Sequence, residues 1–335
     1  MPHQPVAADG AALTRGRMHR LSERLPSKVI DAATVRPFLK WAGGKRQLLP
    51  VLRRFYPARF RGYHEPFLGS GAVFFDLVNQ GRLPAERVRL TDMNADLIGC
   101  CLRLRNQTNE VVAALRRLDD ARRRDPDAHY YRVRDEQFNP ARAAILNGAR
   151  PRPDRYTPEL AAMLIYLNRT GYNGLFRLNA KGAFNVPRGR FVNPRVCDED
   201  NLRAVASAFE AVHATIDYAP YDALVQHAQA EDFIYLDPPY APLSRTAHFT
   251  SYTAGGFSSA DQRRLQQVVL ELADRGCFVL LSNSTAAEIG RLYDGNRDAA
   301  RAGIRAHRVP ARRAINSNTT GRSGVMEYVI TNIAA

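Results

Sequence analysis

The sequence predicts an α/β fold, in which a doubly wound parallel sheet carries an inserted, mainly helical region with a β-hairpin. Two observations lead to this prediction. A short strand at residues 62–65 is followed by a glycine turn at 69–71, an apolar helix and a second strand that ends in Asp92. A later apolar strand, at 233–236, ends abruptly in Asp237. Nucleotide-binding sheets begin with this order of elements: a strand, a glycine turn, a helix and a strand that ends in an acidic residue.

The first predicted elements lie on both sides of the glycine turn. The segment at 38–52 opens with a Trp-Ala-Gly-Gly-Lys turn that begins at Trp41, and the residues after this turn predict an amphipathic helix. The strand at 62–65 follows, and the apolar helix after the glycine turn runs to Val78. Residues 88–90 form the second predicted strand.

Residues 99–205 break the alternation of strands and helices. They contain Arg-rich helical stretches, a Pro-Arg-Pro segment at 151–153 and a block rich in Gly, Asn and aromatic residues at 168–191. Within that block, the Ala-Lys-Gly sequence at 180–182 predicts a hairpin turn. We therefore expect an inserted helical domain that carries a basic hairpin.

The last third of the chain completes the predicted sheet. Ser259 and Gln262 predict a capping box for a helix that ends before Gly276. Apolar residues predict strands at 277–281 and 325–330, and the second of these is expected at the edge of the sheet.

Composition limits the classes of protein to which the chain can belong. It has 335 residues, a formal net charge of +15 and 45% hydrophobic residues. This excludes a disordered polyelectrolyte and a small disulfide-bonded domain. The four cysteines show no Cys-x-x-Cys spacing, which predicts a reducing compartment and no zinc knuckle. We expect a soluble protein, since no run of about 18 apolar residues occurs, and no secretory signal, since residues 1–30 lack an apolar core.

Two stretches of the chain contain no acidic residue, one at 160–197 and one at 299–326. Their cationic residues are Arg169, Arg177, Lys181, Arg188, Arg190 and Arg195 in the first stretch, and Arg301, Arg305, Arg308, Arg312, Arg313 and Arg322 in the second. Positive charge concentrated in this way indicates a docking surface for phosphates. A solvated surface in an arginine-rich proteome is the alternative.

The glycine turn is the first feature that points to a ligand. Because it follows a strand directly, its backbone can approach a ligand closely, beside the N-terminal amides of the next helix. It does not match a dinucleotide fingerprint, since Phe74 replaces the third glycine, and the Gly-Gly-Lys at 43–45 lacks the other residues of a P-loop. The turn therefore suits a nucleoside ligand without a pyrophosphate. Asp92, which lies 21 residues after Gly71, would bind the ribose hydroxyls of this ligand. S-adenosylmethionine fits this description; a structural turn beside a solvent-facing carboxylate is the alternative.

The tetrapeptide Asp237-Pro238-Pro239-Tyr240 is the most specific feature. Two prolines stop the strand and hold the Asp237 side chain and the following carbonyl at the carboxyl edge of the sheet, where ligands bind in such folds. These two acceptors match the two hydrogens of an exocyclic amino group, and Tyr240 supplies a flat face for stacking a base. The pattern indicates methylation of an amino nitrogen on a base extruded from its duplex. A rigid strand end with a core tyrosine is the alternative.

Taken together, the motifs resemble those of Dam-type DNA adenine-N6 methyltransferases of the D12 class, including the relatives found in GATC restriction-modification systems. The resemblance spans residues 38–332. The segments that carry it are Phe38–Lys45, Glu65–Gly71, Tyr166–Arg169, Tyr172–Leu175, Phe184–Pro187, Gly189-Arg190, Asp237–Tyr240, Phe249–Tyr252 and Ser282–Ser284. Thr170 and Phe191 depart from the pattern, since these enzymes often carry Tyr there, which leaves details of sequence readout open.

The resemblance implies a Rossmann-like S-adenosylmethionine-dependent methyltransferase sheet and assigns roles to individual residues. The residues expected to contact or enclose the cofactor are Trp41, Lys45, Glu65, Phe67, Gly69, Gly71, Asp92, Tyr221 and Asp237. The residues expected to hold a flipped adenine are Asp237, Pro238, Pro239 and Tyr240. The residues expected to bind DNA are Lys40, Arg169, Tyr172, Asn173, Leu175, Arg177, Pro187 and Arg190. No metal is implied.

The implied function is site-specific methylation of DNA: transfer of a methyl group from S-adenosylmethionine to N6 of a flipped adenine in double-stranded DNA, within GATC, leaving S-adenosylhomocysteine. Residues 1–35 would form a disordered tail, 36–98 and 206–335 the catalytic domain, and 99–205 the target-recognition domain. A cytosine-N4 methyltransferase, an RNA amino-methyltransferase and a catalytically inactive DNA-binding regulator remain alternatives.

The expected partner is double-stranded DNA. A cognate restriction endonuclease system is a candidate functional partner, and neither a direct protein partner nor a membrane is implied. The expected location is the prokaryotic or phage-infected cytoplasm, in association with the nucleoid.

Overall fold

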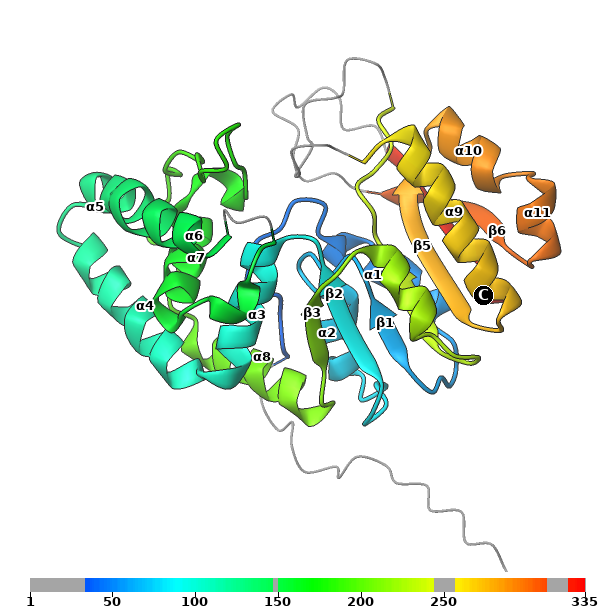
Figure 1. The fold of residues 1–335 in the computed structure, drawn as a ribbon, viewed down its shortest axis with the longest axis horizontal. Coiled ribbons are helices and arrows are strands. Elements are labelled where there is room, and N and C mark those ends of the chain that lie inside the picture. Colours follow the sequence, from blue (N-terminus) through cyan, green and yellow to red (C-terminus); the bar gives the residue numbers. More distant parts are fainter. Residues whose placement is uncertain (1–33, 147–149, 244–256, 312–324, 335) are drawn as a thin grey trace, which may run out of the picture. The chain divides into compact units, whose positions relative to one another are not determined.

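A computed structural model describes residues 34–146, 150–243, 257–311 and 325–334. It contains a seven-stranded sheet with the strand order β3-β2-β1-β4-β5-β7-β6 (Figure 1). The strands are β1 Tyr63–Glu65, β2 Val88–Asp92, β3 Thr215–Tyr218, β4 Phe233–Leu236, β5 Phe278–Ser284, β6 Arg305–Ala311 and β7 Val325–Thr331. The first five pair in parallel, and β7 pairs antiparallel with both β5 and β6. The predicted α/β sheet is confirmed.

The helices fall into two groups along the chain. Those beside the sheet connections are α1 Leu49–Leu52, α2 Ala72–Asn79, α3 Ala95–Asn106, α8 Glu199–Ala211, α9 Ser259–Asp274, α10 Ala287–Tyr293 and α11 Arg297–Arg301. Those between α3 and α8 are α4 Thr108–Arg122, α5 Pro126–Arg132, α6 Asn139–Leu146 and α7 Pro158–Thr170. Figure 1 shows the second group gathered beyond the β3 side of the sheet, away from α9, α10 and α11.

The strand order places a ligand crevice at the middle of the sheet. β1 pairs with β2 on one side and with β4 on the other, so the winding of the chain reverses between β1 and β4. In open α/β sheets, ligands bind at such a reversal, outside the carboxyl ends of the strands. Glu65 ends β1, Asp92 ends β2, and Asp237 directly follows β4. Three carboxyl groups therefore lie along the edge where a ligand is expected.

Alternating side chains of the central strands enter two apolar clusters. In β4, Phe233 and Tyr235 belong to the larger cluster, while Ile234 and Leu236 belong to the smaller one, against α9 and α10. This is the two-residue period of a strand that is covered on both faces. The larger cluster continues into α4 and α7, so the helices between α3 and α8 share their core with one face of the sheet.

The amphipathic helix predicted between the Trp-Ala-Gly-Gly-Lys turn and Leu52 is broken into short pieces. The structure has a 3-10 turn at Lys45–Gln47, the short helix α1 and a second 3-10 turn at Arg53–Phe55. Pro50 lies in the first turn of α1. Because proline lacks a backbone N–H, it begins a helix there and cannot lie within a longer one.

Two further local predictions need correction. The capping box of α9 is formed by Ser258 and Asp261, one residue before the predicted pair, Ser259 and Gln262. The last strand is not the edge strand, because β7 lies between β5 and β6. β6 escaped prediction because an edge strand needs no apolar alternation: most of its side chains are at least partly exposed, and it contains Pro310.

Some predictions fall outside the described residues. These are the tail, Phe249–Tyr252, and Arg312, Arg313 and Arg322 of the second acid-free stretch. The turn predicted at 180–182 is confirmed: the Gly182 amide donates to the Asn179 carbonyl at 2.9 Å, and Leu178 and Phe184 form an antiparallel bridge. Within the described ranges, no helix has the length and apolar character that crossing a membrane requires.

Candidate active site at the carboxyl edge of the sheet

Asp237 is the centre of a polar cluster after β4. Lys45 Nζ lies 2.8 Å from Asp237 Oδ2, and Ser282 Oγ donates to Asp237 Oδ1 at 2.9 Å. Burial raises the pKa of Asp237, while the charge of Lys45 and the hydrogen bonds from Lys45 and Ser282 act against this shift. A carboxylate offers about four lone-pair sites. Both oxygens therefore keep capacity to accept a hydrogen bond from a ligand.

Tyr240 is anchored at both its hydroxyl and its ring. The hydroxyl donates to Glu327 Oε2 at 2.9 Å, and Lys45 Nζ lies 4.7 Å from the ring centroid. Glu327 is on β7, opposite Ser284 of β5, and its exposed fraction is only 8%. The ring of Tyr240 is thus held between the lysine that contacts Asp237 and a nearly buried carboxyl group.

The backbone of the Asp-Pro-Pro-Tyr turn is held by side chains of β5 and α9. Gln262 Nε2 donates to the Pro239 carbonyl at 3.1 Å, and Asn283 Nδ2 donates to Gln262 Oε1 at 3.1 Å. Asn283 Oδ1 accepts from the Ala241 amide at 3.2 Å, and Ser284 Oγ donates to the Ala241 carbonyl at 2.6 Å. These bonds fix the turn independently of the two prolines.

Glu65 and Asp92 resist ionisation because they are buried. Burial raises the pKa of Glu65 to about 8 and the nearby charges of Asp237 and Asp92 add to the shift, although the Tyr63 hydroxyl and the Phe74 amide donate to Glu65 Oε2 at 2.8 and 3.1 Å.

Asp92 behaves in the same way. Burial raises the pKa of Asp92 to about 6, against hydrogen bonds from the amides of Gly69 and Asn94 at 3.0 and 2.8 Å. A positive charge nearby would favour the ionised forms of both carboxyl groups. The edge of the sheet therefore suits a cationic ligand.

Aromatic rings line two parts of the same edge. Phe67 and Tyr221 stack with ring centroids 5.3 Å apart, and Phe257 meets Phe67 edge-on at 6.0 Å. Trp41 lies against the glycine turn, since a Cβ atom at Gly69, whose φ is +46°, would be only 3.2 Å from Trp41 Cδ1. Across the described ranges, no group of three or more His, Cys, Asp or Glu side chains is arranged to hold a metal ion.

Gly71 has a structural place in this turn. Its φ is +67°, in the left-handed region, and it is the N-cap of α2. Its amide donates to the Leu68 carbonyl at 2.7 Å and its carbonyl accepts from the Phe75 amide at 2.9 Å. Glycine is the residue that takes this conformation without strain.

A second group of predicted residues lies on the segment from 168 to 191. Asn168 is buried and fastens this segment to the chain before Trp41: its Oδ1 accepts from the Lys40 amide at 2.8 Å, and its Nδ2 donates to the carbonyls of Lys40 and Gly174 at 2.8 and 2.9 Å. Lys40 Nζ lies 4.3 Å from the ring centroid of Phe191. Lys40 is thereby placed beside the hairpin, although it lies far from it in the sequence.

The turn at Tyr172–Gly174, directly after α7, carries exposed side chains. Tyr172 is 52% exposed, and Asn173 is exposed with a φ of +53°. The Tyr172 amide donates to the carbonyl of Pro187, an exposed residue, at 2.8 Å. Leu175 is half-buried, and exposed Arg177 donates through Nε to Asn185 Oδ1 at 2.8 Å.

The cationic side chains of the first acid-free stretch differ in exposure and in whether they are paired with acidic residues. Arg190 and Lys181 are exposed, whereas Arg188 is paired with Asp127 and Arg195 with Asp198, each at 2.9 Å. Arg169 is half-buried, and burial lowers its pKa. Acidic residues outside the stretch thus neutralise part of its charge.

Sequence reasoning missed several residues of the site. The clearest are Glu327, Phe257 and Asn168, to which no individual site role was assigned, and Gln262, which was predicted only as part of a helix cap. Glu327 had one weak signal, because it is the first acidic residue after the second acid-free stretch. The others contact the predicted residues only through pairings between distant parts of the chain.

Comparison with known proteins agrees with this geometry. Residues 41–315 match the family model of the D12 class N6 adenine-specific DNA methyltransferases. The chain is 34% identical to the type II methyltransferase M1.LlaDCHI of Lactococcus lactis subsp. cremoris, with 89% of this chain and 95% of that protein covered. It is 36% identical to the type II methyltransferase M.MjaIII of Methanocaldococcus jannaschii (89% and 99% covered) and 35% identical to the DNA adenine methylase of Escherichia coli K12 (88% and 94% covered). The chain therefore belongs to the D12 class of N6 adenine-specific DNA methyltransferases.

Proposed function

We propose that this DNA adenine-N6 methyltransferase takes its methyl group from S-adenosylmethionine and transfers it to an adenine flipped out of a GATC site in double-stranded DNA. The observation that carries the proposal is the meeting of Glu65, Asp92 and Asp237 at the carboxyl ends of β1, β2 and β4. Beside Asp237 lies Tyr240, whose hydroxyl donates to Glu327 and whose ring lies under Lys45 Nζ.

The donor set fits S-adenosylmethionine, which supplies an electrophilic methyl group on a sulfonium ion. Asp92 would bind the ribose hydroxyls, and the stacked Phe67 and Tyr221 would enclose the adenine ring. Burial raises the pKa of Glu65 to about 8, and the positive charge of the ligand would favour the ionised form of this carboxyl group. Trp41 would cover the glycine turn from the other side.

The target base is held by the Asp-Pro-Pro-Tyr turn. Asp237 and the Pro238 carbonyl accept the two amino hydrogens, which turns the lone pair of N6 toward the methyl carbon, and Tyr240 stacks on the base. The C–N bond then forms as the C–S bond breaks, and the electron pair of the broken bond stays on sulfur. The extra proton on N6 leaves to solvent after the transfer. Rate acceleration comes from positioning and preorganised charge.

DNA binding is assigned to the segment from 168 to 191 together with Lys40. Tyr172 and Asn173 would wedge into the opened duplex, because both are exposed. The residues that would read bases are Lys40, Leu175, Arg177 and Pro187, and the phosphate contacts would come from Arg169 and Arg190. Binding should weaken steeply with added salt, as neutralised phosphates release their counterions.

This assignment implies a division of labour along the chain. Residues 36–98 and 206–335 would bind the cofactor and carry out the transfer, and residues 99–205 would recognise the target. A role beside a cognate restriction endonuclease is consistent with the type II methyltransferases among the relatives.

Asp237→Ala tests the catalytic assignment. We expect loss of methylation, with duplex binding kept within about tenfold, because only the acceptor for the amino group is removed while the hairpin is unchanged. An active variant would contradict the role of Asp237. Methylation-aware sequencing of DNA from a methylation-free host that expresses the protein identifies the base and the sequence; a modified site other than GATC would refute that part of the proposal.

A further inference from the structure

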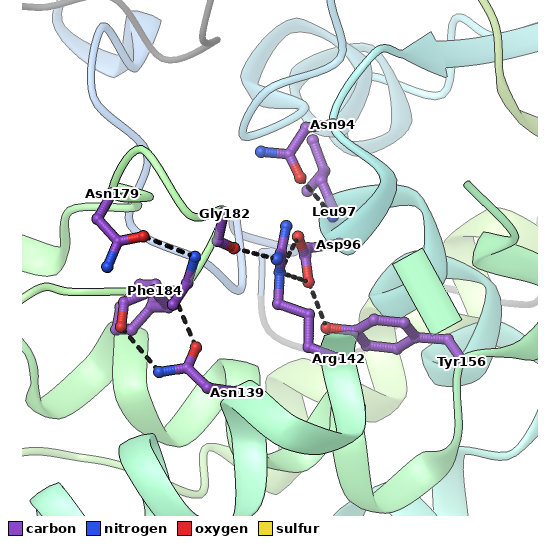
Figure 2. A network of polar contacts seen from close by, with 10 residues as sticks. Asn94, Asp96, Leu97, Asn139, Arg142, Tyr156, Asn179, Gly182 and Phe184 are labelled. Atoms are coloured by element: carbon purple, nitrogen blue, oxygen red, sulfur yellow. Dashed lines mark hydrogen bonds and ion pairs between the residues drawn. The ribbon is translucent and has the colours of Figure 1, made fainter. Parts of the chain in front are cut away.

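The hairpin turn that bridges Leu178 and Phe184 is held by two side chains of α6 (Figure 2). Asn139 Nδ2 donates to the Phe184 carbonyl at 3.0 Å, and the Phe184 amide donates to Asn139 Oδ1 at 2.8 Å. One side-chain amide thus satisfies both backbone groups of a buried residue, as a neighbouring strand would. One turn along the helix, Arg142 Nη1 donates to the Gly182 carbonyl.

The other side of the Arg142 guanidinium is bonded to α3. Its Nε lies 2.9 and 2.8 Å from the two carboxylate oxygens of Asp96, and the Tyr156 hydroxyl donates to Asp96 Oδ1 at 3.1 Å. The side chains of Arg142 and Asp96 are only 9% and 2% exposed. Gly99 makes room for this cluster, since a Cβ atom there would lie 2.5 Å from Tyr156 Cγ.

Asp96 is in the first turn of α3, directly after the predicted cofactor carboxylate. Asn94 caps α3 by accepting from the Leu97 amide at 3.0 Å, and its own amide donates to Asp92 Oδ1 at 2.8 Å. Hydrogen bonds therefore join Gly182 to Arg142 and Arg142 to Asp96, and the backbone of α3 connects Asp96 to Asn94, whose amide bonds Asp92 at the carboxyl end of β2. Figure 2 shows the bonds that join α6 to the hairpin and to α3.

We propose that Asn139 and Arg142 are positioning residues for DNA recognition, which hold the hairpin at a fixed place relative to the carboxyl edge of the sheet. A guanidinium is suited to this, because its planar fork reaches a carboxylate and a carbonyl at once, whereas a lysine ammonium is a single point of charge. The inference rests on the proposed role of the hairpin in reading DNA.

Arg142→Lys and Asn139→Ala test this proposal. We expect the KM for the cognate duplex to rise at least tenfold. The ratio of kcat/KM for the cognate site over a site with one changed base pair should fall at least tenfold. The dissociation constant of S-adenosylhomocysteine should stay within twofold, since neither variant touches the cofactor side chains. A merely structural role would lower thermal stability without changing the discrimination ratio.

The matched control is Arg122→Lys. Arg122 is a similarly buried arginine in the same helical region, with a side chain 10% exposed, and it donates to Asp119 Oδ1 through Nε at 3.0 Å and Nη2 at 2.8 Å. This variant should lose stability to a similar degree and keep the wild-type KM and discrimination ratio. If Arg142→Lys and Asn139→Ala give the same KM and ratio as the control, the proposal is overturned.

A variant at exposed Tyr172, at the start of the hairpin, separates this inference from the proposed function. Tyr172→Ala should raise the KM for duplex DNA. If it does so while Arg142→Lys and Asn139→Ala do not, the hairpin reads DNA but needs no support from α6, and only the inference fails. If Tyr172→Ala leaves the KM unchanged, the hairpin does not read DNA, and the inference falls together with that part of the proposed function.

Discussion

Removing the Tyr240 hydroxyl should slow methylation about tenfold without unfolding the protein. The hydroxyl donates to Glu327 Oε2 at 2.9 Å, and Glu327 is nearly buried on β7. A hydrogen bond to a charged group contributes about 1.5–3 kcal/mol. Because Tyr240 is half-buried, the lower figure applies, and about 1.4 kcal/mol corresponds to a factor of ten in rate. The ring keeps its area for stacking in Tyr240→Phe, but loses the anchor that fixes its orientation.

Single-turnover methylation of a cognate duplex measures this effect in Tyr240→Phe, Glu327→Gln and the double variant. If Glu327 acts through Tyr240, the double variant should be no slower than the slower single variant. Tyr328→Phe is the control, since the Tyr328 hydroxyl also bonds a carboxylate, Asp294 Oδ2 at 2.9 Å, away from the site; its rate should match the wild type. Multiplicative losses in the double variant would refute the reasoning.

Three further predictions follow from the structure. Gly174→Ala should cost about 1–3 kcal/mol of unfolding free energy in urea titrations and raise the KM for duplex DNA, because φ is +62° and the new Cβ atom would lie 2.4 Å from Lys40 Cβ. Affinity for S-adenosylmethionine, measured by titration calorimetry, should rise from pH 6 to pH 8, since the pKa of Glu65 is raised to about 8 by burial and a cationic ligand favours its ionised form; Glu65→Gln should flatten this rise. Ser258→Ala should cost about 1 kcal/mol of unfolding free energy, because the capping box with Asp261 is lost.

A specific measurement would contradict each of these three predictions. A Gly174→Ala protein with wild-type stability and KM would show that the contact with Lys40 is not tight. Cofactor affinity that is flat with pH in the wild type would remove Glu65 from the binding equilibrium. An unchanged urea midpoint in Ser258→Ala would mean that α9 does not depend on its cap.

The central part of the fold could be predicted because its signals are local. β4 is an apolar run and β2 a short strand, and an acidic residue ends β2 and directly follows β4, so Asp92 and Asp237 could be placed at one edge before any contact was known, whereas Glu65 was assigned through the resemblance. β3 and β6 gave no such signal. They lie at the two edges of the sheet, where alternating exposed side chains do not differ from those of a loop.

The connections within the site could not be predicted, because they join distant parts of the chain. Glu327 reaches Tyr240 only through the antiparallel pairing of β7 with β5, and this pairing depends on β7 lying inside the sheet. Arg142 meets its partners across the packing of α6 against α3 and the hairpin, and Asn168 bonds Lys40, 128 residues earlier in the chain. No neighbour of Arg142 in the sequence marks it as more than a helix-surface side chain.

Trp41 gives the protein a built-in optical probe, because it is the only tryptophan in the sequence. Its ring stacks on Phe176 of the hairpin segment, with centroids 5.6 Å apart and planes 21° apart, and it also lies against the turn at Gly69. Indole emission depends on the surroundings of the ring, and here those surroundings belong to both proposed binding regions. Unlabelled protein should therefore report the arrival of cofactor and of duplex in one fluorescence channel, and the order in which the two ligands bind becomes measurable by stopped flow.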